Sequence, residues 1–101
     1  MKRLTDREFH MTVEQGTGPF LVELTAYYCG VCHEWAKDLE AWSSRNGIPC
    51  AEVELYESRA VARKYKPAGV PTTILFIDGK EEKRWVGPFD LDEDIKDRLP
   101  K

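Results

Sequence analysis

The sequence has no long hydrophobic run, and its cysteines are few. Three cysteines in 101 residues are an odd number, too few for the disulfide framework of a small secreted protein. No segment approaches the ~18 consecutive apolar residues of a membrane-spanning helix, and the N-terminus lacks the apolar stretch of ~7–15 residues typical of an export signal. These absences predict a cytoplasmic protein without a membrane segment.

Low-complexity tracts, internal repeats and linkers are also missing. The seven glycines and six prolines are spread along the chain, where they separate short elements. With 42% hydrophobic and 33% charged residues, the chain can bury a core, which excludes a disordered protein or a fibre. We therefore expect a single domain over residues 1–101.

Positive charge is not in excess. Fifteen Lys and Arg residues stand against eighteen Asp and Glu residues, which gives a formal net charge of -3 at pH 7. Proteins that bind nucleic acid or anionic membranes use a surplus of cations. The composition therefore argues against nucleic acid and membranes as partners, and we expect the chain to act as a monomer.

What the sequence does contain is an alternation of helical and strand patterns. Helical spacing of apolar residues predicts helices over residues 6–15, 31–46, 58–66 and 91–99. Apolar or alternating runs predict strands over residues 20–24, 49–55, 72–77 and 81–86, and Asp78-Gly79 joins the last two as an antiparallel hairpin. This order predicts an α/β fold with a mixed central sheet and helices on both of its faces.

Glu23 is an anomaly inside the apolar run 20–24. A nearly continuous apolar run suits a strand that is covered on both faces. Burial of a carboxylate there is expected to raise its pKa towards the range that is useful for a general base. The alternative is an edge strand on which Glu23 faces water.

Two cysteines stand in the motif Cys29-Gly30-Val31-Cys32, where the predicted strand 20–24 is followed by the predicted helix 31–46. Cysteines three positions apart at a helix start face the same side and can form a disulfide. The free amides and the positive dipole end of the helix stabilise a thiolate on Cys29, the outer cysteine, while Cys32 is expected to be more buried. The pattern indicates thiol–disulfide exchange, the alternative being a pair of buried structural cysteines.

The motif and its surroundings resemble the thioredoxin family over nearly the whole chain. Four segments carry the resemblance in their order and spacing: Val22-Glu23-Leu24, Ala26-Tyr27-Tyr28-Cys29-Gly30-Val31-Cys32, Ala68-Gly69-Val70-Pro71-Thr72 and Val86-Gly87. The resemblance implies the thioredoxin fold and thiol–disulfide exchange with protein substrates, in which Cys29 attacks and Cys32 resolves. It also implies an upstream dithiol reductant or reductase, and no bound cofactor or metal is needed because the cysteines carry the electrons.

The resemblance implies roles for the residues around the cysteine pair. Glu23 takes the position of a buried carboxylate that exchanges a proton with Cys32. Pro71 takes the position of a cis-proline that faces the cysteines and leaves the preceding backbone free to pair with a substrate strand. A substrate groove is implied, with these residues at its borders: Tyr27, Tyr28, Gly30, Val31, Val70, Pro71 and Gly87.

Several positions depart from the family pattern. Tyr28 and Val31 replace the usual tryptophan and proline of the motif, Thr25 replaces another tryptophan, and Glu52 replaces a lysine expected near the buried carboxylate. Proline has no amide donor, so Val31 makes one more N–H available to the Cys29 thiolate and predicts a more oxidising couple. The first strand of the fold is expected to be short or missing.

His33 directly follows the motif. As a cation near the helix start, His33 is expected to favour the Cys29 thiolate, and as a neutral imidazole it is expected to relay a proton. The alternative is an ordinary surface histidine.

Three other functions remain open. The pattern C-x-x-C-H also occurs at covalent haem attachment sites, and Cys29, Cys32, His33 and Cys50 offer four zinc ligands. A binding or chaperone-like module of the same fold, with little redox turnover, is the third alternative. Cys50 itself is expected to be a buried free thiol, with a resolving or regulatory role as the alternative.

Overall fold

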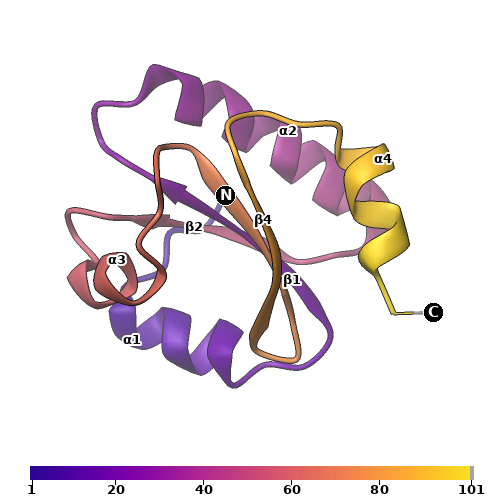
Figure 1. Cartoon of the computed structure of the whole chain (residues 1–101), viewed down its shortest axis with the longest axis horizontal. Helices are drawn as coiled ribbons and strands as arrows, with labels where there is room; N and C mark the ends of the chain where they lie inside the picture. The colour runs from indigo at the N-terminus through magenta and orange to yellow at the C-terminus, as the bar shows by residue number, and fades with distance from the viewer. Residues whose placement is uncertain (101) are drawn as a thin grey trace.

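Four strands form one mixed sheet in the computed structural model, which describes residues 1–100 (Figure 1). The strands are β1 (Pro19–Thr25), β2 (Cys50–Glu54), β3 (Thr72–Ile77) and β4 (Lys80–Val86), and their spatial order is β2-β1-β3-β4. β1 runs parallel to β2 and antiparallel to β3, and β3 pairs antiparallel with β4. The predicted mixed sheet is thereby confirmed, with β1 between two neighbours.

Helices cover both faces of this sheet, as Figure 1 shows. On one side lie α1 (Asp6–Phe9), its continuation η1 (His10–Glu14), a wider π-helical turn, and α3 (Arg59–Tyr65). On the other side lie α2 (Gly30–Asn46), α4 (Leu91–Ile95) and η2 (Lys96–Arg98), a 3-10 turn. The α/β prediction is confirmed in its layers as well as in its sheet.

The two faces hold separate hydrophobic clusters because side chains alternate along a strand. Val22 and Leu24 of β1 join the cluster against α1 and α3, whereas Leu21 joins the cluster against α2 and α4. The first cluster consists of Leu4, Phe9, Val13, Val22, Leu24, Ala51, Val53, Val61, Ile74 and Phe76. The second consists of Leu21, Trp35, Leu39, Trp42, Ile48, Leu75 and Ile95.

The first strand of the fold is reduced to one bridge. Arg3 pairs in parallel with Glu52 at the outer edge of β2. The N–H of Leu4 donates to the Glu52 carbonyl, and the N–H of Glu52 donates to the Lys2 carbonyl, each at 2.9 Å. The prediction of a short or missing strand is therefore confirmed.

The hairpin turn follows directly from its two residues. Asp78 and Gly79 have φ angles of 52° and 81°. A two-residue turn with both central φ angles positive matches the right-handed twist of the flanking strands, and Asp-Gly adopts it readily.

The prediction of a regular helix to Leu99 is wrong in part. The α-helical turns of α4 end at Ile95, η2 continues to Arg98, and Leu99 is extended with φ -83° and ψ 145°. Pro100 is the reason, because the residue before a proline is forced out of the helical region. Likewise, the predicted helix 6–15 is α-helical only to Phe9 before η1 begins. No helix of residues 1–100 is long and apolar enough to cross a membrane.

Candidate active site

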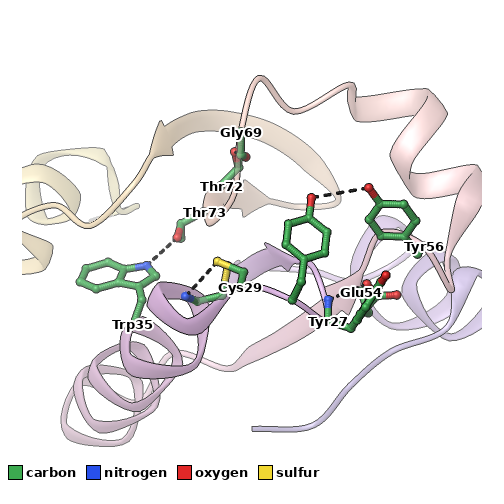
Figure 2. The surroundings of a disulfide bond; sticks show 10 residues. Tyr27, Cys29, Trp35, Glu54, Tyr56, Gly69, Thr72 and Thr73 are labelled. Atoms are coloured by element: carbon green, nitrogen blue, oxygen red, sulfur yellow. Dashed lines mark hydrogen bonds between the residues drawn. A yellow bond between two sulfur atoms is a disulfide. The ribbon is translucent and has the colours of Figure 1, made fainter.

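Cys29 and Cys32 form a disulfide at the start of α2 (Figure 2), with their Cα atoms 5.3 Å apart. Cys29 is the N-cap of the helix, and its Sγ accepts a hydrogen bond from the Cys32 N–H at 3.2 Å. Cys29 is partly exposed, whereas Cys32 has no exposed surface. One turn of helix therefore separates an accessible sulfur from a protected one.

Glu23 lies in the centre of the sheet and is only 1% exposed. Since it alternates with Val22 and Leu24, its side chain points to the face that α2 covers. Among the described residues, neither of its carboxylate oxygens has a hydrogen-bond partner. Burial raises the pKa of Glu23 to about 8, and the nearby charge of Glu52 adds to the effect. The alternative of an edge position facing water is wrong, because β1 has neighbours on both sides.

The strands on either side place polar groups beside Glu23. In the register of the sheet, Glu23 stands opposite Glu52 of β2 and Thr73 of β3. The hydroxyl of Thr73 accepts a hydrogen bond of 2.9 Å from the indole N–H of Trp35, which Figure 2 shows on the α2 side of the disulfide. This hydrogen bond joins the first half of α2 to β3.

Arg3 supplies a cation that the sequence analysis did not identify. Its guanidinium contacts the Glu52 carboxylate through Nε and Nη2, each at 2.8 Å. Glu52 stands where the family pattern led us to expect a lysine, so here the positive charge comes from the N-terminal segment. The sequence predicted a short first strand, and this was the available signal for the position of Arg3. The single bridge of that strand pairs Arg3 with Glu52.

The loop before β3 brings a third segment to the site. The peptide bond between Val70 and Pro71 is cis, as the resemblance implies. Gly87 donates its N–H to the Pro71 carbonyl at 2.8 Å, which joins the end of β4 to this loop. Within residues 1–100, neither the N–H nor the carbonyl of Val70 forms a hydrogen bond.

Three exposed tyrosines flank the disulfide on the side away from Trp35. Tyr27, Tyr28 and Tyr56 contact one another edge to face, with ring centroids 5.3–5.8 Å apart. Beneath them, the Glu54 carboxylate accepts hydrogen bonds from the N–H groups of Tyr27 and Glu57, at 3.0 and 2.7 Å. Tyr56 was not predicted from the sequence, although the parallel arrangement of β1 and β2 was the available signal. The carboxyl ends of parallel strands meet at one edge of a sheet, which places Tyr56 beside Tyr27 and Tyr28.

Of the remaining candidate residues, three adjoin the cysteine pair and Cys50 lies away from it. Gly30 and Val31 are exposed between the two cysteines, and His33 is exposed in the first turn of α2. Cys50 is a free thiol that is partly rather than fully buried, and it pairs with Leu21 at the end of β1 remote from the disulfide. In the described part of the chain, no three His, Cys, Asp or Glu side chains gather in a group that could hold a metal ion.

These features define a class of protein: an α/β domain with a cysteine pair at a helix N-terminus, beside a buried carboxyl group and a cis-proline loop. Such a pair passes between dithiol and disulfide without unfolding the chain.

Comparisons with known proteins agree with this class. The family model described as Thioredoxin matches residues 1–100. Thioredoxin of Rhodospirillum rubrum is 30% identical over 89 residues, which covers 86% of each chain. A protein named bifunctional thioredoxin reductase/thioredoxin of Mycobacterium leprae is 35% identical over 83% of this chain and 19% of its own length. The X-ray structure of Fasciola hepatica thioredoxin superposes with a TM-score of 0.85 at 27% identity, over 97% of this chain and 99% of that one.

The chain belongs to the thioredoxin family, and it is a thiol–disulfide oxidoreductase with the redox pair Cys29 and Cys32.

Proposed function

We propose that this oxidoreductase reduces or exchanges disulfides of protein substrates, with Cys29 as the attacking cysteine and Cys32 as the resolving one. The observation that carries the assignment is the difference between the two sulfurs. Cys29 is partly exposed and accepts the Cys32 N–H, whereas Cys32 is fully buried. A nucleophile needs access to substrate, and its partner needs protection from it.

In the first step, the Cys29 thiolate attacks one sulfur of the substrate disulfide. A bond forms between Cys29 Sγ and that sulfur, the substrate S–S bond breaks, and the departing thiolate takes a proton from water. The Cys32 N–H, 3.2 Å from Cys29 Sγ, and the dipole of α2 favour negative charge on Cys29. When protonated, the exposed His33 adds positive charge to the same helix end.

In the second step, Cys32 attacks Cys29 Sγ in the mixed disulfide. Its thiol first gives its proton to the Glu23 carboxylate on the same side of the sheet. The Cys29–Cys32 bond then forms, the mixed disulfide breaks, and the second substrate thiolate leaves, so that two electrons have passed to the substrate. A pKa of about 8 suits Glu23 for this role, because a catalytic base works best when its pKa lies near the operating pH.

The loop around the cis-proline is proposed to hold the substrate backbone. An extended substrate segment can pair with the N–H and carbonyl of Val70, in the manner of a strand added to a sheet edge. Pro71 and Gly87 support that loop through their 2.8 Å hydrogen bond. Tyr28, Gly30 and Val31 form the opposite border of the substrate site, next to Cys29.

A dithiol reductase is the proposed source of electrons. The relative from Mycobacterium leprae is named as both a thioredoxin reductase and a thioredoxin. This combination favours a reductase of that class as the electron donor here. We also propose that residues 1–101 act as one monomeric domain in the cytoplasm. The reduced thiol pool of that compartment suits a protein with the free thiol Cys50.

The decisive experiment is a glutathione redox titration in which free thiols are alkylated and located by mass spectrometry. We expect one reversible two-electron transition that joins Cys29 and Cys32. Cys32→Ser is expected to accumulate a mixed disulfide between Cys29 and a model protein substrate, whereas Cys29→Ser forms none. Cys50→Ser is the matched control and should titrate like the unaltered protein. Failure of Cys29 and Cys32 to pair, with binding of substrate retained, would favour a binding module instead.

A further inference from the structure

Exposed apolar side chains are concentrated around the disulfide. Six large hydrophobic residues are exposed in the described chain, and Met11 is the one that lies elsewhere. The other five are Tyr27, Tyr28, Val31, Tyr56 and Val86. The tyrosines contact one another, Val31 lies between the two cysteines, and Val86 precedes Gly87 beside the cis-proline loop. Such a patch next to a reactive sulfur marks a surface that binds a partner.

A groove extends this patch towards α3. It has a volume of about 410 Å³, within the range of about 300–1,000 Å³ typical of ligand pockets. Its lining includes Tyr28, directly before Cys29, and Val70, directly before Pro71, and it also includes Tyr56. Figure 2 shows Tyr56 on the side of the disulfide away from Trp35. A segment paired with Val70 would therefore continue into it.

The α3 side of the groove carries positive charge. Arg59, the first residue of α3, and Lys66, the residue that ends it, both line the groove and are exposed, and neither forms an ion pair within residues 1–100. The two acidic residues that shortly precede Arg59 in the sequence have other partners: Glu54 accepts two backbone N–H groups, and Glu57 faces Arg3 at 4.0 Å. The groove is thus a local cationic site on a protein with a net charge of -3.

We propose that this groove binds the acidic part of a disulfide substrate: an extended segment with an apolar or aromatic side chain near its reacting cysteine and carboxylates a few residues away. The apolar side chain packs on Tyr28 and Tyr56, and the carboxylates pair with Arg59 and Lys66. Tyrosine and arginine are among the residue types that most often dominate binding energy at interfaces. The inference rests on the proposed function, because the segment reaches the groove only when its disulfide is presented to Cys29.

The test uses three disulfide-bonded peptides that are identical except for a pair of Glu, Gln or Lys residues beside the reacting cysteine. For each peptide, the second-order rate constant of its reduction by the reduced protein is measured. This value is divided by the rate constant with which the same protein reduces 2-hydroxyethyl disulfide, a small neutral substrate. We expect the acidic peptide to react about tenfold faster than the basic one, with the neutral peptide between them. Added salt should reduce this ratio, because exposed charges are screened.

Charge reversal identifies the groove as the source of the preference. The double variant Arg59→Glu, Lys66→Glu is expected to invert the order of the three peptides. The double variant Arg45→Glu, Arg63→Glu makes the same change in net charge at exposed positions outside the groove and is expected to keep the original order.

Two contrary outcomes have different meanings. If 2-hydroxyethyl disulfide is reduced but the three peptides react at equal rates, the groove inference is wrong. It is also wrong if the variant at Arg45 and Arg63 loses the preference as fully as the variant at Arg59 and Lys66. No reduction of 2-hydroxyethyl disulfide by the unaltered protein would instead contradict the proposed function, and the groove inference would fall with it.

Discussion

Glu23 and Glu52 stand opposite each other on the parallel strands β1 and β2, yet only Glu52 has a cationic partner. Arg3 holds Glu52 at the outer edge of the sheet, while the carboxyl group of Glu23 is buried without a hydrogen bond from the described residues. Because the buried carboxyl group of Glu23 has a raised pKa, we expect the stability of the fold to depend on pH.

Substitution Glu23→Gln is expected to stabilise the oxidised protein at high pH. The folded pKa of Glu23 is about 8 against an ordinary value of 4.5, so between these values the folded state keeps a proton that the unfolded state has lost. Stability of the unaltered protein therefore falls as pH rises from about 4.5 to about 8 and then levels off. At pH 9 the variant should be more stable by about 2–5 kcal/mol, since one pKa unit corresponds to ~1.4 kcal/mol.

Urea denaturation at pH 4, 6.5 and 9 measures this difference. Glu34→Gln, at an exposed position on α2, is the control and should change the free energy of unfolding by less than about 0.5 kcal/mol at each pH. A difference between Glu23→Gln and the unaltered protein that does not grow with pH would contradict the linkage.

Two substitutions at the Arg3–Glu52 pair should move the pKa of Glu23 in opposite directions. Glu52→Gln removes a negative charge beside Glu23 and is expected to lower its pKa, whereas Arg3→Gln removes the compensating cation and is expected to raise it. A carbon-13 NMR titration of the Glu23 carboxyl group measures both shifts. Shifts of the same sign would mean that the pair acts on Glu23 through packing rather than through charge.

The two glycines near the β3–β4 turn should differ sharply in their tolerance of alanine. Gly79 and Gly18 both have positive φ, 81° and 74°. A Cβ on Gly79 would lie 2.1 Å from the carbonyl oxygen of Glu14, whereas a Cβ on Gly18 meets nothing within 4 Å. Gly18→Ala is expected to cost about 1–2 kcal/mol of stability, the conformational term alone, and Gly79→Ala about 3 kcal/mol or more. Equal losses in thermal or urea denaturation would show that the turn can move away from η1.

The ionised carboxylate of Glu14 is expected to stabilise the fold at neutral pH, and this stabilisation is expected to disappear in acid. Burial alone would raise its pKa, but hydrogen bonds from Lys64, Tyr65 and His10 outweigh burial and lower the pKa to about 2. The stabilisation is fully present above about pH 4.5 and is lost as pH falls towards 2. Glu14→Gln should therefore lower the free energy of unfolding by about 1–3 kcal/mol at pH 7 and by less at pH 3, as followed by circular dichroism in urea. A difference in the free energy of unfolding between Glu14→Gln and the unaltered protein that stays constant with pH would contradict an ionic origin of the stabilisation.

Local patterns in the sequence predicted most of the fold. The apolar run 20–24, the Asp78-Gly79 turn and the helix after Cys29 each carry their information within a few residues, and each forms as expected. The helix ends were less accurate, because the first helix changes to η1 after Phe9 and the last one changes to η2 after Ile95. Pro100 was nonetheless a local signal that Leu99 would leave the helix.

Sequence by itself determined the chemistry: a cysteine pair at a helix start, a carboxylate in a covered strand and a proline before β3. Only the tertiary structure decided which distant residues lie beside these groups. Arg3 reaches Glu52 across one bridge, and Tyr56, Arg59 and Lys66 join Tyr28 because two parallel strands end at the same edge. The physical reason is range: backbone preference and side-chain periodicity act over neighbouring residues, whereas charge pairing and groove formation depend on strand order and register.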